Sequence, residues 1–503
     1  MKNIGTKVAK GALWMVLFKF TERSLGIIST IILARLLVPE DFGLIAMAMS
    51  IIAVLELMGA FGFDMALIQN QKAERSHYDT AWTFNVLFAV ISSILLVLIA
   101  VPTANFYHEP RLELIIYFLA LGTFITGFEN IGVVAFRKDL EFRKEFKFLV
   151  LKKVASFSVT IPLAFIMESY WALVIGILTG KVFSVLISYL MHHYRPKLCL
   201  SKAAELFSFS KWLLINNILY FLRLHSADFI VGRLLGAHTL GVYTVAFEIS
   251  NLPTTELIAP INRAVYPGYA KMASDLALLR TGFLNTLTII TLFAIPAGIG
   301  ILATADLVVR VVLGDKWLEA IPVIQILAIY GVATAIQTNT LYIFLATGKP
   351  RISTALSALY VLILLPTLYY LCLDYGMVGA AWSYAIVAGI MLPVTLLVTF
   401  KYLRIAPMSF FKCIWRIIIS AIVMYFSVTQ FIAWVGDING IAFEIVVLLT
   451  AVAIGALTYT TTLLTLWIVS GRPSGGEESI LDKAFPKLPS FLQLQILKTK
   501  LPK

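Results

Sequence analysis

Two stretches of this chain, ILARLLVPEDFGLIAMAMSI (residues 32–51) and IVGRLLGAHTLGVYTVAFEI (residues 230–249), decide the fold, because they match at a constant offset of 198 residues. Shared apolar composition does not easily place arginine, glycine and tryptophan in one register. The sequence therefore predicts an internal repeat. Its matched positions include Arg35-Leu36-Leu37 with Arg233-Leu234-Leu235, Gly43 with Gly241, and Trp14 with Trp212.

The composition around these stretches is that of a membrane protein. Of the 503 residues, 60% are hydrophobic and only 14% are charged, against about 25% charged in soluble proteins. Apolar runs of helical length recur, as in LFAVISSILLVLIAV at residues 87–101. Barrel strands would instead be segments of about ten residues with alternating polarity. We therefore expect an all-α, polytopic membrane protein, with the basic N-terminal segment leading into a retained first helix.

The apolar runs predict about fourteen transmembrane helices. We place them near residues 12–37, 42–63, 82–104, 113–136, 147–167, 170–191, 206–235, 240–266, 283–304, 321–346, 353–373, 376–400, 411–432 and 442–468. With the N-terminus in the cytoplasm, most basic loop residues fall inside, and the outward loops hold Arg111, Arg310 and Lys316 and little else that is basic. This alternation follows the positive-inside rule. We expect a multi-pass membrane protein with both termini cytoplasmic.

The repeat and the span count together predict the domain organisation. Six spans separate the two copies, so both copies enter the membrane from the same side, as in transporters built from two parallel lobes. We expect an N-lobe at 1–200, a C-lobe at 201–405, two additional spans at 406–470 and a cytoplasmic tail at 471–503. The tail end SFLQLQILKTK suits either a membrane-surface segment or a disordered one.

Charge and cysteine content exclude several other classes. The net charge of +12 is explained by cytoplasmic loops of a membrane protein, and we expect no nucleic-acid partner. The three cysteines are far apart and lack the spacing of a metal site. No P-loop pattern is present, so we expect no cofactor and no ATP site, and transport driven by a gradient.

The first span carries three charges, Lys19, Glu22 and Arg23, at i, i+3 and i+4, on one helix face. Each would cost about 2.5–3.5 kcal/mol at the centre of a bilayer. That face is therefore expected to line a hydrated cavity, with Lys19 opposite its repeat equivalent Asn217. The alternative is that the charges neutralise one another as contacts between helices, including a local pair of Arg223 with Asp228.

We take as substrate-binding candidates ionisable and polar residues in the first span of the predicted N-lobe and in the first two spans of the predicted C-lobe, including the span ends. These residues are Lys19, Glu22, Arg23, Arg35, Asn217, Tyr220, Arg223, Asp228, Arg233, Glu248 and Asn251. Arg35 and Arg233 equally suit snorkelling to the interface. Further polar residues within spans include Glu56, Glu129 and Lys181. No catalytic or metal-ligating set is expected.

Three motifs carry a resemblance over roughly residues 5–405: ARLLVPEDFGL (34–44), AFRKDLEFRK (135–144) and GVYTVAFEISNLPTTELIAPINRAVYPGYAKM (241–272). In their order and spacing the chain resembles bacterial polysaccharide exporters of the multidrug/oligosaccharidyl-lipid/polysaccharide superfamily. More specifically, it is similar to flippases for exopolysaccharide, capsule or O-antigen repeat units, including the colanic-acid type.

The resemblance implies a lipid-linked oligosaccharide flippase. Its substrate would be a repeat unit on polyprenyl pyrophosphate, moved by alternating access from the inner to the outer leaflet of the bacterial plasma (inner) membrane. Membrane lipids, a polysaccharide polymerase and other assembly proteins are the implied partners.

Other functions remain open at this point. A drug or metabolite antiporter of the same superfamily would share the fold, although a cation exporter would favour an acidic cavity. A membrane polysaccharide polymerase or glycosyltransferase would carry catalytic acidic residues in an outward loop, and the loops here are short. A scaffolding role is a further alternative.

Overall fold

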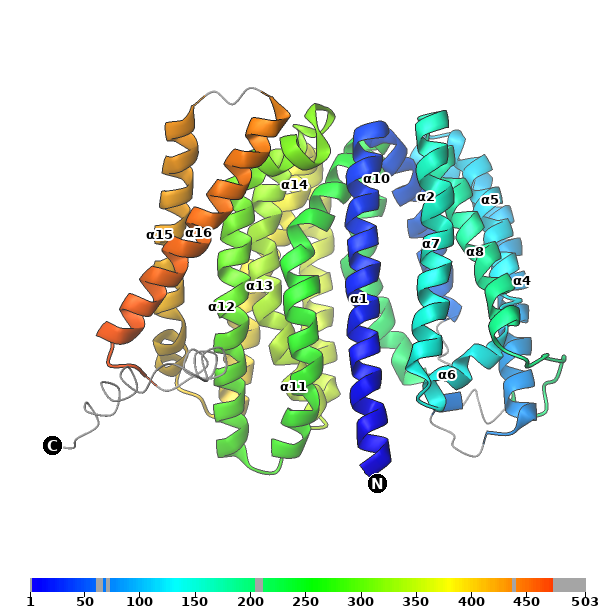
Figure 1. Ribbon diagram of the computed structural model, residues 1–503, viewed down its shortest axis with the longest axis horizontal. Helices are drawn as coiled ribbons and strands as arrows, with labels where there is room; N and C mark the ends of the chain where they lie inside the picture. The colour runs from blue at the N-terminus through cyan, green and yellow to red at the C-terminus, as the bar shows by residue number, and fades with distance from the viewer. Residues whose placement is uncertain (1, 60–66, 69–72, 204–210, 437–439, 474–503) are drawn as a thin grey trace. The chain divides into compact units, whose positions relative to one another are not determined.

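The structure is a computed structural model that describes residues 2–59, 67–68, 73–203, 211–436 and 440–473 (Figure 1). Within these ranges the chain is helical and contains no strand. The expected tail segment SFLQLQILKTK lies outside the described residues. The all-α fold predicted from the sequence is confirmed.

Fourteen α-helices make up the described part of the chain. They are α1 (Lys2–Leu36), α2 (Pro39–Gly59), α4 (Arg75–Tyr107), α5 (Arg111–Thr126), α6 (Val134–Lys138), α7 (Phe142–Met167), α8 (Trp171–Met191), α10 (Lys211–Leu252), α11 (Ala259–Met272), α12 (Leu276–Val308), α13 (Ala320–Ala346), α14 (Pro350–Leu403), α15 (Pro407–Val435) and α16 (Ile441–Val469). Short 3₁₀ or π turns connect several of them: η1 (Ile131–Val133), η2 (Pro253–Ile258), η3 (Val309–Leu313) and η4 (Asp315–Trp317).

Two of the helices are too long to be single spans. With 42 and 54 residues, α10 and α14 would extend for about 60 and 80 Å at the helical rise, roughly two or more times the hydrocarbon core. Each breaks at a glycine with positive φ, Gly236 at 82° and Gly376 at 62°. The halves of α14 contact each other across its break, where the Ser383 hydroxyl donates to the Thr367 carbonyl at 3.1 Å.

The helices therefore account for the predicted spans. Among the described residues, nine helices are long and apolar enough to cross a membrane, or ten if the bent pair of α5 with the segment 131–138 counts as one span. When α10 and α14 are divided at their glycines and α1 and α2 are included, each predicted range corresponds to one helix or to two consecutive helices. The protein is a multi-pass membrane protein.

The backbone separates into two compact units that do not follow chain order. The first comprises residues 1–246, 309–323 and 357–383, and the second comprises 247–308, 324–356 and the chain from 384 onward. The division into lobes at residues 200 and 405 stays a prediction.

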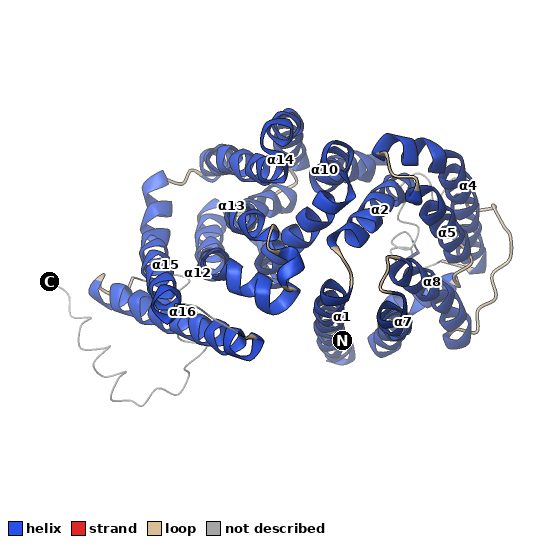
Figure 2. Cartoon of the chain, turned by 90° about the horizontal axis from the view of Figure 1, so that it is seen from above, coloured by secondary structure: helices blue, strands red, loops and turns tan. Residues whose placement is uncertain are grey.

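In the first unit, α4, α5, α7 and α8 form a bundle, and α1 packs along α7 (Figure 2). Leu33 and Leu37 near the end of α1 are buried against Ala164 of α7 and Ala172 of α8. Nearer the start of α1, the centre of the Trp14 ring lies 5.0 Å from the centre of the Phe146 ring. Apolar contacts thus fix α1 to α7 over several turns.

In the second unit, α12 packs against α15, and α15 packs against α16. Its core includes Tyr269, Phe283, Leu287 and Phe400, which are almost completely buried. The Tyr459 hydroxyl of α16 donates to the Leu292 carbonyl of α12 at 2.9 Å. This buried hydrogen bond connects the last helix to the rest of the unit.

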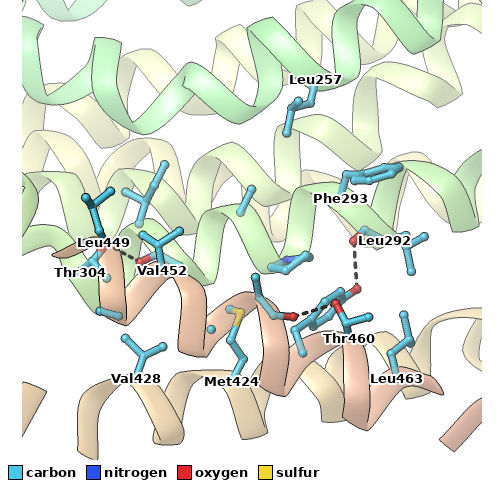
Figure 3. A pocket seen from close by; sticks show the side chains of 18 of the residues that line it. Leu257, Leu292, Phe293, Thr304, Met424, Val428, Leu449, Val452, Thr460 and Leu463 are labelled. Atoms are coloured by element: carbon cyan, nitrogen blue, oxygen red, sulfur yellow. Dashed lines mark hydrogen bonds between the residues drawn. The ribbon is translucent and has the colours of Figure 1, made fainter. Parts of the chain in front are cut away.

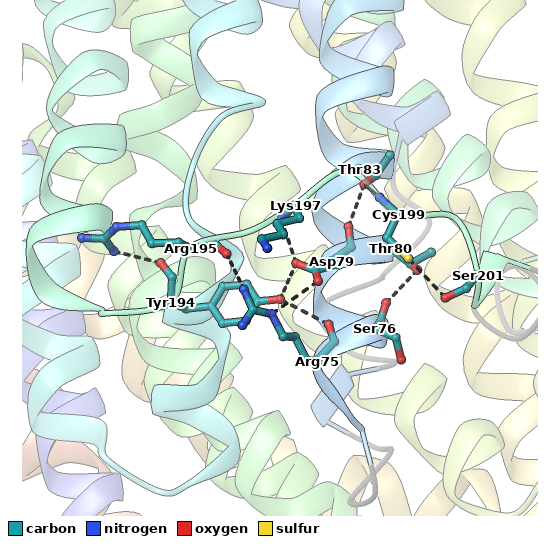
Figure 4. Close-up of polar contacts among 10 residues, drawn as sticks. All are labelled: Arg75, Ser76, Asp79, Thr80, Thr83, Tyr194, Arg195, Lys197, Cys199 and Ser201. Atoms are coloured by element: carbon teal, nitrogen blue, oxygen red, sulfur yellow. Dashed lines mark hydrogen bonds and ion pairs between the residues drawn. The ribbon is translucent and has the colours of Figure 1, made fainter.

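An extended segment after α8, which we call the strap (residues 192–199), crosses the first turns of α4 (Figure 4). Asp79 accepts hydrogen bonds from the Tyr194 hydroxyl at 2.7 Å and from the Lys197 amide at 2.8 Å. The Cys199 amide donates to Thr83 Oγ1 at 2.9 Å. Burial, together with the bond to Asp79, raises the pKa of Tyr194, so its hydroxyl stays protonated and remains a donor.

Candidate functional site

The three charges of the first span lie on α1 as their spacing predicted. Lys19 Nζ and Glu22 Oε2 form an ion pair at 2.6 Å, with both side chains well exposed. Arg23 is half-buried one residue further along. Lys19 and Arg23 are cationic and Glu22 is anionic, so the three side chains together carry one net positive charge on this part of α1.

The polar residues in the first half of α10 have partners that the sequence did not indicate. Asp228 pairs with His225 Nδ1 at 2.7 Å, and not with Arg223. The Arg223 guanidinium carbon lies 4.3 Å from the centre of the buried Tyr360 ring, in cation–π geometry. Tyr220 is 67% exposed and Asn217 is half-buried.

The two repeat-related arginines have different partners. Arg35, at the end of α1, donates to the Val311 carbonyl, whereas Arg233 lies 5.6 Å from the centre of the Phe106 ring. Beside Arg35, the fully buried Trp317 donates from Nε1 to the Ala34 carbonyl at 2.8 Å. The end of α1 is thus covered by η3 and η4, which lie far from α1 in the sequence.

Glu248 and Asn251 lie beyond residue 246 and belong to the second unit. Glu248 is exposed. Asn251 Nδ2 donates to the Phe247 carbonyl of its own helix at 2.9 Å. The other nine candidates all belong to the first unit.

The repeat meets itself in the first unit. A Cβ atom added to Gly43 would lie 1.8 Å from the carbonyl oxygen of Ala237, and one added to Gly241 would lie 1.7 Å from that of Pro39. The 198-residue offset relates Gly43 to Gly241 and also Pro39 to Ala237. The contact therefore has the reciprocity of a two-fold interface, because each glycine touches the residue four positions before the other glycine.

An apolar groove in the second unit was not anticipated from the sequence (Figure 3). It has a volume of about 840 Å³ and is lined by α12, α15 and α16, with one residue from η2. Its lining includes Phe293, Met424, Leu449 and Leu463. The small residues Gly300 of α12 and Gly455 of α16 also line it, and glycines within these apolar segments were the available sequence signal.

Comparisons with known proteins agree with this architecture. The chain is 24% identical over 389 residues to the lipopolysaccharide biosynthesis protein WzxC of Escherichia coli (strain K12), covering 76% of this chain and 79% of that protein. It is 23% identical over 342 residues to the succinoglycan biosynthesis transport protein ExoT of Rhizobium meliloti (strain 1021), covering 67% and 69%.

Among solved structures, the lipid II flippase MurJ in an inward closed conformation superposes with a TM-score of 0.75 at 12% identity, covering 92% of this chain and all of that one. This likeness establishes the fold. The model of the family described as "Polysaccharide biosynthesis protein" matches residues 32–322, which include both copies of the repeat and their contact. The chain belongs to this polysaccharide biosynthesis protein family.

Proposed function

We propose that this protein is a flippase that moves an oligosaccharide linked to polyprenyl pyrophosphate from the cytoplasmic to the outer leaflet of the bacterial plasma membrane. The observation that carries the proposal is the family match over residues 32–322. The similarity to a succinoglycan transport protein and the fold shared with a lipid II flippase support transport over an enzymatic role.

The chemistry of the substrate suits the residues of the first unit. A pyrophosphate cannot cross hydrocarbon without a replacement for its hydration shell. Guanidinium and ammonium groups supply charge-assisted hydrogen bonds to phosphate oxygens. Arg23 and Lys19 on α1 and Arg223 on α10 attract the headgroup, and Lys19 and Asn217 face one aqueous cavity. Arg35 and Arg233, where matching helices end, attract the headgroup at the outward side.

The polyprenyl tail needs an apolar path. The groove along α12, α15 and α16 offers about 840 Å³ of almost entirely apolar lining. A flexible isoprenoid chain would gain about 25 cal/mol for each Å² of apolar surface that it buries. The tail thus lies in the groove or in the bilayer beside it while the headgroup crosses.

The transport cycle follows the predicted topology. Both termini lie in the cytoplasm, and lobes 1–200 and 201–405 alternate the access of the cavity to each side. The segment 471–503 stays on the cytoplasmic side. Ion, potential or substrate gradients drive the cycle, and a polymerase with its assembly proteins consumes the product outside.

The test is a strain that lacks the chain. Spheroplasts of this strain should hold lipid-linked repeat units that an added lectin cannot reach, and the cells should lack the surface polysaccharide. Complementation with the wild-type chain should restore lectin access. If repeat units reach the outer leaflet at the normal rate without the chain, the proposed function is wrong.

A further inference from the structure

A polar pocket of about 280 Å³ lies inside the first unit, apart from the candidates on α1 and α10. It is lined by residues of α2, α4, α5 and α8 and by the break between α5 and α6, where the helix axis bends by 66°. The break itself contributes Gly127, Glu129 and Asn130. Non-helical backbone at membrane depth is tolerated where it lines a cavity, and broken helices in transporters point to binding sites.

Charged groups of both signs line this pocket. Glu56 comes from α2, Glu129 from the break and Lys181 from the middle of α8. The charges of Glu56 and Lys181 attract each other across the pocket. Within the described residues, however, neither side chain forms a direct hydrogen bond or ion pair. Their hydrogen-bonding capacity is therefore free for a ligand.

Neighbouring residues fix the geometry of the pocket. A Cβ atom at Gly122 would lie 2.9 Å from Lys181 Cδ, so the lysine stem passes directly over α5 at this glycine. Ser184 donates to Glu129 Oε2 at 2.5 Å. The fully buried Asn130 donates to the carbonyl of Tyr194 at 2.7 Å, which ties the break to the strap.

We infer that this pocket binds a single sugar ring of the lipid-linked oligosaccharide. The inference rests on the proposed function and specifies a sugar subsite within it. Glu56 and Glu129 accept hydrogen bonds from hydroxyl groups, Lys181 donates them, and the amide of Asn85 does both. Phe88 supplies an apolar surface for the face of the ring.

Size and charge favour this ligand over the pyrophosphate. A volume of about 280 Å³ lies just below the range of about 300–1,000 Å³ for small-molecule sites, which suits one ring and not a chain. Two carboxylates repel an anion. Lys181 and Lys152 of α7, whose charge also acts on Lys181, balance these carboxylates, so the ligand need not be charged.

Binding of two synthetic carriers to the purified protein in lipid nanodiscs tests the inference. One carrier is undecaprenyl pyrophosphate with a single hexose, and the other is the bare pyrophosphate. Wild type should bind the hexosylated carrier more tightly. Glu56→Gln and Lys181→Met should each weaken that binding by about ten- to hundredfold, the usual effect of losing a hydrogen bond to a charged group, and leave the bare carrier unaffected.

Two variants outside the pocket are matched controls. Lys144→Met and Glu141→Gln each remove one charge of an exposed ion pair, Lys144 Nζ with Glu141 Oε2 at 2.7 Å, and neither residue lines the pocket. Both should bind each carrier as wild type does. A thermal unfolding midpoint for every variant identifies loss of folding, and Glu56→Gln carries the test if Lys181→Met does not fold.

Three results overturn the inference. Pocket variants with unchanged affinity for the hexosylated carrier would exclude a sugar contact. An equal loss of affinity for both carriers would indicate a structural role. If wild type binds the two carriers equally, the pocket does not hold the sugar, although the proposed function stands. If wild type binds neither, the proposed function fails first.

Discussion

Gly43 and Gly241 are equivalent residues of the internal repeat, and each packs against the backbone of the residue four positions before the other glycine. Gly43 contacts the carbonyl of Ala237, and Gly241 contacts that of Pro39. At both positions a methyl group would overlap a carbonyl oxygen. Helices α2 and α10 therefore approach as closely as their backbones allow, on both sides of a local two-fold relationship.

Replacing Gly43 by alanine should destabilise this contact. Overpacking typically costs about 1–3 kcal/mol, which should lower the thermal unfolding midpoint of the purified protein. The same substitution at Gly241 should have a similar effect, and the double variant should cost less than the sum because the first change already separates the backbones.

Gly389→Ala is the matched control, since Gly389 is helical and a Cβ atom there would meet nothing within 4 Å. Alanine in a helix with free space is stabilising by up to about 1 kcal/mol. If Gly43→Ala and Gly389→Ala shift the midpoint alike, the close approach does not exist in the folded protein.

Arg23→Ala should abolish polysaccharide export while the amount of protein in the membrane stays normal. Arg23→Lys should retain part of the export, because the charge survives but a lysine cannot hold a phosphate through two parallel bonds. Export is measured as surface polysaccharide relative to protein abundance on immunoblots. A packing role for these charges would give a different pattern: protein and export would fall together, and Glu22→Gln combined with Arg23→Ala would restore both.

Tyr194→Phe should loosen the strap. It removes the hydroxyl that donates to Asp79 at 2.7 Å, a charge-assisted hydrogen bond worth about 1.5–3 kcal/mol. Limited proteolysis should cut the strap faster than in wild type. Tyr370→Phe removes a hydroxyl from a tyrosine that is 65% exposed, and this control should leave the cleavage rate unchanged. Equal rates for all three proteins would contradict the anchoring role.

Acid should weaken the connection between α4 and α5 through Glu109. The hydrogen bond and charge of Arg111 hold the pKa of Glu109 below its usual value of 4.5. A group whose pKa is lowered on folding stabilises the protein above its unfolded-state pKa, and this stabilisation is lost as the pH falls through the folded-state pKa.

The unfolding midpoint of wild type should thus fall more steeply below pH 4.5 than that of Glu109→Gln. The two proteins should differ most near neutral pH, where only wild type has the ionised carboxylate. Parallel curves from neutral pH to pH 3 would show that this pair does not contribute to stability.

Reporter fusions that end at His77 and at Gly436 should report opposite sides of the membrane. His77 lies in the first turn of α4, and Gly436 follows α15. The expected result is a cytoplasmic signal at His77 and an outward signal at Gly436. Signals from the same side would disprove the predicted topology.

The elements were predictable because apolar runs of helical length identify spans whatever their neighbours are. The breaks at Gly236 and Gly376 were also within reach, since Gly236 lies between two predicted spans and Gly376 is the first residue of one. Side-chain partners were less predictable. Asp228 binds His225, while Arg223 lies over Tyr360, a residue 137 positions away. The pocket of Glu56, Glu129 and Lys181 was missed because its charges come from three separate segments, and no local pattern reports that they meet.

The burial of Trp317 against Ala34 sets an order of events during synthesis. The first helix is made early, but the tryptophan that covers its end follows 283 residues later. At a translation rate of about 5–20 residues per second, the end of α1 waits on the order of 15–60 s for this partner. Until then, water or the insertion machinery must satisfy the carbonyl of Ala34, to which Trp317 later donates. A ribosome that stalls before residue 317 would leave the first unit unfinished, although nearly all of its helices have already been made.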